Sequence, residues 1–263
     1  MIGMDIVREM VLNTLFTGRL KNGWLVSLIL LATPESGKTS IVNSFNAKNI
    51  GIFTDLTGKG LLDALESHSE MSHIVLNDLT VTSAHSKKTS AYFFAILGAA
   101  TEEGIKSIGD PSGNTNYNLR RGAIVCTTIE FIADKRRLWI TNGLSSRFLP
   151  FCYRHSEALQ AKVLRSIKPQ NSDGEIHIPE IKVPDSLINV TISDNMIFEC
   201  ERMALIMAGQ NKEMGYRRKK QFMSLVMARA LRREWKNPKV QDKDIQWLSS
   251  IQEFLSWSKP HEI

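Results

Sequence analysis

The residues with the clearest chemical potential are Ala-Thr-Pro-Glu-Ser-Gly-Lys-Thr at positions 32–39. An apolar run precedes them and a helix-compatible segment follows, as a phosphate-binding loop between a strand and a helix requires. The pattern is a Walker A motif with Ala in place of its first Gly. Backbone N–H groups of such a turn point at phosphate oxygens, and the helix start adds the positive end of its dipole. A chance Gly-Lys-Thr in a surface loop is the alternative.

These residue types predict ATP as the ligand, with Mg²⁺ beside it. We expect the ammonium of Lys38 to reach the β- and γ-phosphates and the hydroxyl of Thr39 to bind Mg²⁺. The expected ATP-binding residues in and next to the motif are Thr33, Pro34, Glu35, Ser36, Gly37, Lys38, Thr39 and Ser40.

A carboxylate ends another apolar run, at Asn77 and Asp78. Phosphoryl transfer uses one group at Mg²⁺ and a carboxylate that orients the attacking water. In the register that we prefer, Asp78 is that carboxylate and Asn77 is a neutral ligand of the Mg²⁺ water shell, so the metal set is Thr39, Asn77 and Asp78. In the other register Asp78 takes the first place and Leu79 leaves the second empty. Either register predicts slow hydrolysis, and a simple capping Asp is the plainer alternative.

Two further polar residues complete the expected catalytic set of Asp78, Thr128 and Arg147. Thr128 closes an apolar run and is expected between the loop and the Asp78 strand, close to the γ-phosphate. Arg147 lies at a helix-to-strand junction, from which it could be presented to a neighbouring subunit. There its planar guanidinium would neutralise charge on the γ-phosphate. An ordinary surface Arg in an intrachain salt bridge is the alternative.

The hydrophobic pattern places these residues at strand ends. Strands are expected at 24–31, 49–54, 72–78, 123–128 and 148–153, with helices at 4–20, 40–49, 61–68, 86–103 and 130–138, a turn at 56–60 and a β-hairpin within 105–121. Strands that alternate with helices predict a parallel sheet with helices on both faces.

After about residue 155 the pattern becomes mainly helical. Helices are expected at 156–167, 195–211, 217–235 and 242–257, and short extended segments at 175–178 and 189–192. The predicted fold class is therefore α/β: a P-loop parallel sheet sandwiched by helices, followed by a mainly α-helical lid domain. We expect a core domain at 1–155 and a lid at 156–263, with the Pro-rich segment 168–185 as the boundary or an insertion.

Composition is that of an ordinary globular protein: 263 residues, 43% hydrophobic and 23% charged. The three cysteines show no paired spacing, which favours free thiols in a reducing, cytoplasmic compartment of a bacterial, archaeal or phage-infected cell. The longest apolar run is too short to span a bilayer and the N-terminus lacks a signal-peptide pattern, so no membrane partner is expected. A net charge of +6 fits a nucleic-acid partner but also a basic protein without one.

Taken in order, these motifs resemble the AAA+ ATPase family: Walker A at 32–39, a Walker B-like strand end at Asp78, a sensor-1-like Thr128 and an arginine-finger-like Arg147. The helical C-terminal part resembles the family's lid. The resemblance implies a sensor-2 arginine in contact with ATP, either Arg217 or Arg218, and we favour Arg218. It also implies a ring or spiral of about six subunits in which Arg147 of one subunit completes the ATP site of the next.

Two loops could face a central pore in that fold, and both are basic. Lys59 lies in the 56–60 turn, and the hairpin carries Lys106, Arg120 and Arg121. Lys and Arg contact phosphate, so these four are the expected DNA-binding residues. The hairpin before the sensor-1 strand resembles that of the family's replicative-helicase branch, although a surface excursion without a ligand is the alternative. The basic helix within 216–236 could face DNA or simply be solvated.

The expected function is an ATP-hydrolysing, ring-forming motor, helicase or helicase loader that acts on DNA in replication or in a mobile-element or phage process. The alternative is an ATP-dependent assembly switch or scaffold that remodels a protein partner. A small-molecule kinase is the third possibility.

Overall fold

The computed structural model describes residues 2–45, 47, 49–110, 113–166, 181–209 and 212–263. The helices are α1 (Asp5–Phe16), α2 (Lys38–Val42), α3 (Gly58–Ser67), α4 (Leu79–Ser83), α5 (Lys87–Ala100), α6 (Ile129–Asp134), α7 (Arg136–Thr141), α8 (Leu144–Arg147), α9 (Glu157–Ser166), α10 (Asp194–Ala208), α11 (Lys212–Arg233) and α12 (Asp242–Ser250), with 3₁₀ turns η1 (Thr17–Arg19) and η2 (Gln252–Phe254). The strands are β1 (Ser27–Leu31), β2 (Ile50–Phe53), β3 (His73–Leu76), β4 (Ile105–Asp110), β5 (Gly113–Leu119), β6 (Gly122–Thr127), β7 (Phe148–Arg154) and β8 (His261–Glu262).

Six strands form one parallel sheet in the order β2-β3-β6-β1-β7-β8. The strand β1 lies inside it, paired with β6 and β7, and every one of its side chains is buried. An apolar strand of this kind belongs in a sheet that is covered on both faces. The sheet confirms the predicted α/β class, and β6 lies between β1 and β3 as expected.

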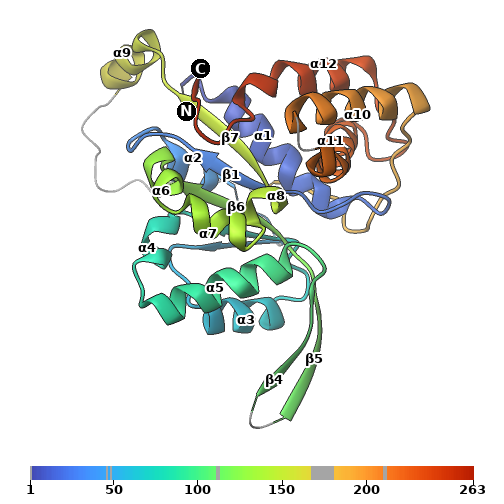
Figure 1. The fold of residues 1–263 in the computed structure, drawn as a ribbon. Coiled ribbons are helices and arrows are strands. Elements are labelled where there is room, and N and C mark those ends of the chain that lie inside the picture. Colours follow the sequence, from blue (N-terminus) through green and yellow to red (C-terminus); the bar gives the residue numbers. More distant parts are fainter. Residues whose placement is uncertain (1, 46, 48, 111–112, 167–180, 210–211) are drawn as a thin grey trace, which may run out of the picture.

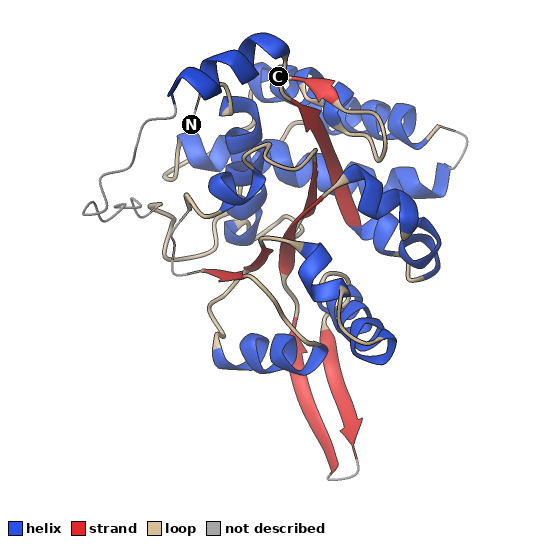
Figure 2. Ribbon diagram, turned by 90° about the vertical axis from the view of Figure 1, so that its left-hand side faces the viewer, coloured by secondary structure: helices blue, strands red, loops and turns tan. Residues whose placement is uncertain are grey.

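Helices cover both faces of the sheet (Figures 1 and 2). Alternate residues of β1 enter two apolar clusters: Leu28 and Leu30 pack with α1, α2 and the C-terminal helices, whereas Ile29 and Leu31 pack with α3 and α5. The strands β4 and β5 pair as an antiparallel hairpin that projects from the body of the molecule (Figure 1). No helix within the described ranges has the length and apolar character needed to cross a bilayer.

Several elements differ from the sequence expectation. The helix α3 begins at Gly58, inside the expected turn, because the Thr57 hydroxyl accepts a hydrogen bond from the Gly60 N–H at 3.1 Å and caps the helix. The helix α2 has 5 residues and is shorter than expected. The expected helix at 130–138 divides into α6 and α7. The expected strand at 175–178 lies outside the described residues, and Thr191 forms a single bridge to Lys239.

The C-terminal helices and α1 share one apolar core. Helix α11 packs against α10, α12 and α1, and buried side chains of all four belong to the same cluster. At the end of the chain, β8 pairs with β7 through Tyr153 and His261. The N-terminal helix is thus packed with the C-terminal helices, and the expected boundary at residue 155 stays a prediction.

Most cations of the basic helix α11 are engaged inside the chain. The carboxylate of Glu9 accepts from Arg229 at 2.9 Å and from Arg232 at 3.0 Å, and that of Asp244 accepts from Arg229 at 2.8 Å and from Arg233 at 2.7 Å. Other members pair with Glu102 and Glu201, while the ammonium of Lys220 lies 5.4 Å from the ring centre of Trp24. The ion pairs of helix α11 therefore mainly connect it to α1, α10 and α12.

We predict that Asp244→Asn lowers the free energy of unfolding by about 2–4 kcal/mol, because two arginines lose their shared buried carboxylate. Asp244 is fully buried, and it also accepts from the Gln241 N–H at 2.9 Å at the start of α12. Urea unfolding measures the change. The matched control is Asp242→Asn, an exposed carboxyl in the same helical turn, which we expect to change stability by less than about 0.5 kcal/mol. Equal effects of the two variants would contradict the prediction.

Candidate nucleotide site at the carboxyl edge of the sheet

The loop at 32–37 leaves β1 at the carboxyl edge of the sheet and contains two residues with left-handed backbone. Glu35 has φ 61° and Gly37 has φ 79°, directly before α2. Left-handed φ in a residue with a side chain is strained, and such strain gathers at functional sites. Tyr153 supports the loop from β7, since its hydroxyl donates to the Ser36 carbonyl at 3.2 Å. Thr33 and Glu35 are exposed, so the loop is open to solvent.

The ammonium of Lys38 folds back over this loop. Its Nζ donates to the carbonyls of Ala32 at 2.8 Å and Thr33 at 2.7 Å, and to the Ser36 hydroxyl at 3.1 Å. Burial lowers the pKa of Lys38, while the neighbouring Cys126, Asp78 and Glu130 act in the opposite direction. Lys38 therefore lies within electrostatic reach of two carboxyl groups. Thr39 and Ser40 follow on the exposed first turn of α2.

Two oxygens are buried without partners at the ends of the adjacent strands. Within the described ranges, Asn77 Oδ1 and Thr127 Oγ1 have no hydrogen-bond partner. Both lie at the carboxyl edge, where the Ala32 N–H donates to the Thr127 carbonyl at 3.4 Å. The Oδ1 of Asp78 caps α4, accepting from the N–H and the hydroxyl of Thr80 at 2.8 and 2.7 Å. The capping alternative for Asp78 is therefore observed, beside its electrostatic effect on Lys38.

Thr128 lies next to this edge but its hydroxyl is used locally. It caps α6 by accepting from the Phe131 N–H at 3.2 Å. Glu130, in the first turn of α6, is exposed and raises the pKa of both Lys38 and Cys152. Glu130 was not among the residues expected from the sequence, although it lies two residues after Thr128. The described residues contain no cluster of three or more His, Cys, Asp or Glu that could hold a metal ion.

Arg147 lies at the opposite, amino edge, immediately before Phe148, whose strand partner is the first residue of β1. Its Nε donates to Glu102 at 2.5 Å and its Nη1 donates to the Asn142 carbonyl. The other carboxylate oxygen of Glu102 accepts from Arg217. The intrachain salt bridge that the sequence left open for Arg147 is therefore present, and it joins the turn after α5 to α8 and α11.

The two expected sensor-2 arginines lie at this same amino edge and make no contact with the loop among the bonds described for them. Arg218 is buried and donates to the carbonyls of Phe148 at 2.9 Å and Ser145 at 3.0 Å. Burial, and then the charge of Arg217, lower the pKa of Arg218 to about 10. Arg218 secures the junction of α8 and β7, and Arg217 joins α8 to Glu102. The expected contact of Arg217 or Arg218 with ATP therefore stays a prediction.

A cavity of about 360 Å³ lies beside Arg147 at the amino edge. Four cations line it, namely Arg120, Arg147, Arg217 and Lys220, against the two carboxylates of Glu102 and Glu103. Trp24 lines it as well, so the cavity combines a positive charge with an aromatic wall.

The expected DNA-binding residues do not form one cluster. Lys59 lies exposed on the first turn of α3, after the carboxyl end of β2, whereas Lys106 and Arg120 lie exposed at the base of the hairpin before the amino end of β6. Arg121 is buried, and it donates to the carbonyls of Arg120 at 2.8 Å and Ser69 at 3.3 Å. Arg121 is thus a structural residue, which corrects its assignment to DNA. The three cysteines are free, as expected, and all three are buried.

A comparison with models of known protein families finds no match, and a comparison with curated proteins finds none either. The functional argument therefore rests on the motifs and on the geometry of the site.

We predict that Arg121→Ala lowers the free energy of unfolding by about 1–2 kcal/mol, because the part-buried hydrogen bonds to the carbonyls of Arg120 and Ser69 are lost. Lys106→Ala is the control, and its exposed side chain should leave stability within about 0.5 kcal/mol. Urea unfolding of both variants measures the difference. Unchanged stability together with weakened oligonucleotide binding in Arg121→Ala would restore the original assignment.

Proposed function

We propose that the chain is an ATPase that binds ATP at the 32–39 loop and is completed by Arg147 of a neighbouring copy. The observation that carries the proposal is the loop itself, with left-handed Glu35 and Gly37 and with Lys38 folded over it. A backbone turn of this kind directs N–H groups at an anion. The phosphates of ATP would replace the carbonyls of Ala32 and Thr33 as partners of Lys38.

Mg²⁺ fits the residues at this edge through oxygen ligands and their water shell. Asn77 offers a buried carbonyl oxygen without a partner, and Asp78 and Thr39 offer a carboxylate and a hydroxyl. Such hard oxygen donors suit Mg²⁺, which retains several waters when bound. When bound, Mg²⁺ neutralises charge on the phosphates. Glu130 would orient the attacking water, since Leu79 leaves no carboxylate after Asp78 and the Asp78 Oδ1 caps α4.

A second copy is needed in this proposal because Arg147 and the loop lie at opposite edges of the sheet. The cationic cavity around Arg147 would face the neighbour's nucleotide, and Glu102 would release Arg147 to the γ-phosphate. A ring or spiral of about six subunits follows from the resemblance to AAA+ ATPases. DNA is the proposed substrate of the assembly, contacted through Lys59, Lys106 and Arg120.

An ATP-dependent assembly switch that remodels a protein partner is the second candidate. It is favoured by the shortage of carboxylates after β3, where Asn77 replaces one of the two usual acids. The compartment proposed in either case is the cytoplasm.

The proposal predicts complementation between two inactive variants. Lys38→Ala should lose ATP binding, and Arg147→Ala should bind ATP but hydrolyse it about 10³-fold more slowly, as expected when an arginine finger is removed. Mixing the two should restore part of the phosphate release, because each Arg147→Ala subunit can receive an intact Arg147 from a Lys38→Ala neighbour. Phosphate release and ATP affinity are measured separately.

Each result discriminates between the candidates. Loss of ATP binding in Arg147→Ala, or a mixture that stays inactive, would contradict a site shared between subunits. Mass measurement of the wild-type assembly with ATP, with and without DNA, separates the two functions. If ATP assembles the chain, DNA does not change the mass of the assembly and no hydrolysis is measured, the results would favour the ATP-dependent assembly switch.

Glu130→Gln should reduce ATP hydrolysis at least about 10²-fold while ATP affinity stays unchanged, because the amide cannot accept the proton of the attacking water. Asp134→Asn, an exposed acid on the same helix, is the control and should hydrolyse ATP like the wild type. Single-turnover kinetics measures the chemical step. Equal rates for Glu130→Gln and the control would remove Glu130 from the mechanism and leave the nucleotide site intact.

A further inference from the structure

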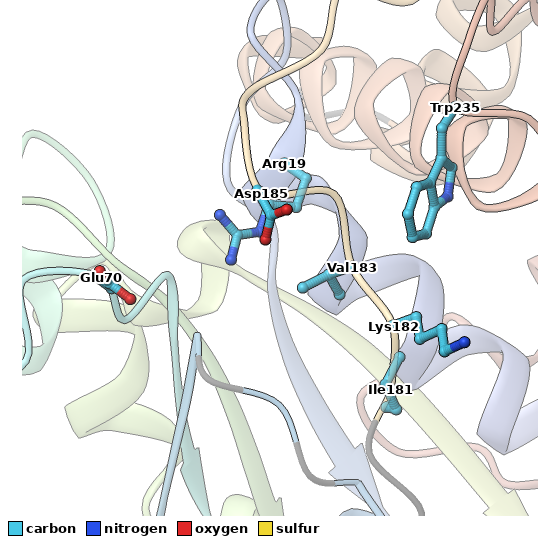
Figure 3. Close-up of a pocket in the computed structure, with 7 residues that line it drawn as sticks. All are labelled: Arg19, Glu70, Ile181, Lys182, Val183, Asp185 and Trp235. Atoms are coloured by element: carbon cyan, nitrogen blue, oxygen red, sulfur yellow. The ribbon is translucent and has the colours of Figure 1, made fainter.

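Two adjoining cavities of about 640 and 300 Å³ lie beside the end of helix α11. They share three lining residues, Ile181, Lys182 and Trp235, and we call them together the Trp235 groove. Figure 3 shows the indole of Trp235 extending toward the segment that carries Lys182 and Val183, with Arg19 and Asp185 farther along. The groove belongs neither to the loop site nor to the cavity around Arg147.

One end of the groove is strongly cationic. The smaller cavity is lined by Arg8, Lys182 and Arg232, and the described residues around it include no acid. Glu9 accepts from Arg232, but Arg232 Nη1 is buried and has no hydrogen-bond partner among the described residues. Burial lowers the pKa of Arg232; Glu9 opposes this, and the like charges of Arg229 and Arg8 lower it further. An anion would relieve this crowding of positive charge.

Trp235 supplies an aromatic surface next to these cations. Trp235 is 40% exposed, so part of its ring is open to a ligand. Proteins that bind single-stranded nucleic acid combine two kinds of group: cations that contact the phosphate backbone, and aromatic rings on which the bases stack. The larger cavity also carries Glu70 and Asp185 together with Arg19, so its far end is less positive than the Arg8 end. This difference in charge favours a phosphate at the Arg8 end and a base at the indole.

We propose that the Trp235 groove binds a nucleotide of single-stranded nucleic acid, with its base on Trp235 and its phosphate near Arg8, Lys182 and Arg232. The inference rests on the nucleic-acid partner of the proposed function, for which it supplies a contact separate from Lys59 and the hairpin. The sugar is not specified by these contacts, so DNA and RNA strands share the required chemistry.

The test is fluorescence anisotropy of labelled oligothymidylate and oligouridylate with the full chain, without ATP. Trp235→Ala should bind about tenfold more weakly, and Trp235→Phe should recover part of the loss. Arg8→Glu should weaken binding. It should also reduce the slope of the logarithm of the binding constant against the logarithm of the salt concentration by about 1 or more. The matched controls are Phe198→Ala, an exposed aromatic on α10, and Lys88→Glu, an exposed cation on α5; both should bind like the wild type.

The outcomes separate this inference from the proposed function. Unchanged affinity in Trp235→Ala and Arg8→Glu, with losses only in Lys106→Ala or Arg120→Ala, would overturn the groove and keep the nucleic-acid partner. A wild type that binds neither oligonucleotide without ATP would overturn the groove, and the same measurement with ATP would decide whether the assembly still binds nucleic acid. AMP that competes as strongly as the oligonucleotide would overturn a strand as the ligand. Because no ATP is present in the tests of the groove, failure of the proposed ATPase cannot produce their results.

Discussion

The parallel pairing of β1 with β6 and β7 is the constraint on which the rest of the structure depends. It gathers the loop, Asn77 and Thr127 at the carboxyl edge, and it sends Arg147 to the amino edge. The 5 residues of β1 separate the two edges by about 13 Å. The strand is buried on both faces, so it cannot shift to bring them together. One chain therefore cannot bring its own Arg147 to its own loop, which is why the proposed function requires a second copy.

The carboxylate of Glu102 explains how arginines can be held in place before a phosphate is present. A guanidinium fork binds carboxylate and phosphate with similar geometry. Glu102 bonds Arg147 through one oxygen and Arg217 through the other. If Arg147 moves to a phosphate, Arg217 still neutralises Glu102, so the half-buried carboxylate is not left without a cation. Two arginines on one carboxylate therefore lower the cost of releasing one of them.

Local pattern was enough to predict five of the six sheet strands and the loop, since a continuous apolar run such as Leu28–Leu31 followed by Gly37 and Lys38 leaves few alternatives. It did not predict β8. Local pattern could not predict which charged residues pair with one another. The acids that neutralise α11 come from α1 and α12, and the partner of Arg147 is Glu102 in another part of the chain. The start of α3 was missed because two glycines favour a turn, while the capping hydroxyl of Thr57 outweighed them.

The two buried oxygens at the carboxyl edge without hydrogen-bond partners among the described residues lower the stability of the folded chain when no ligand is bound. A buried polar atom without a partner costs about 1–3 kcal/mol, and Asn77 Oδ1 and Thr127 Oγ1 are two such atoms on neighbouring strands. Asn77 follows β3 and Thr127 ends β6, so both residues lie at the same edge of the sheet as the loop after β1. In the proposed site, a hydrated, charged ligand would give Asn77 Oδ1 a partner when it binds, so binding would offset part of this cost.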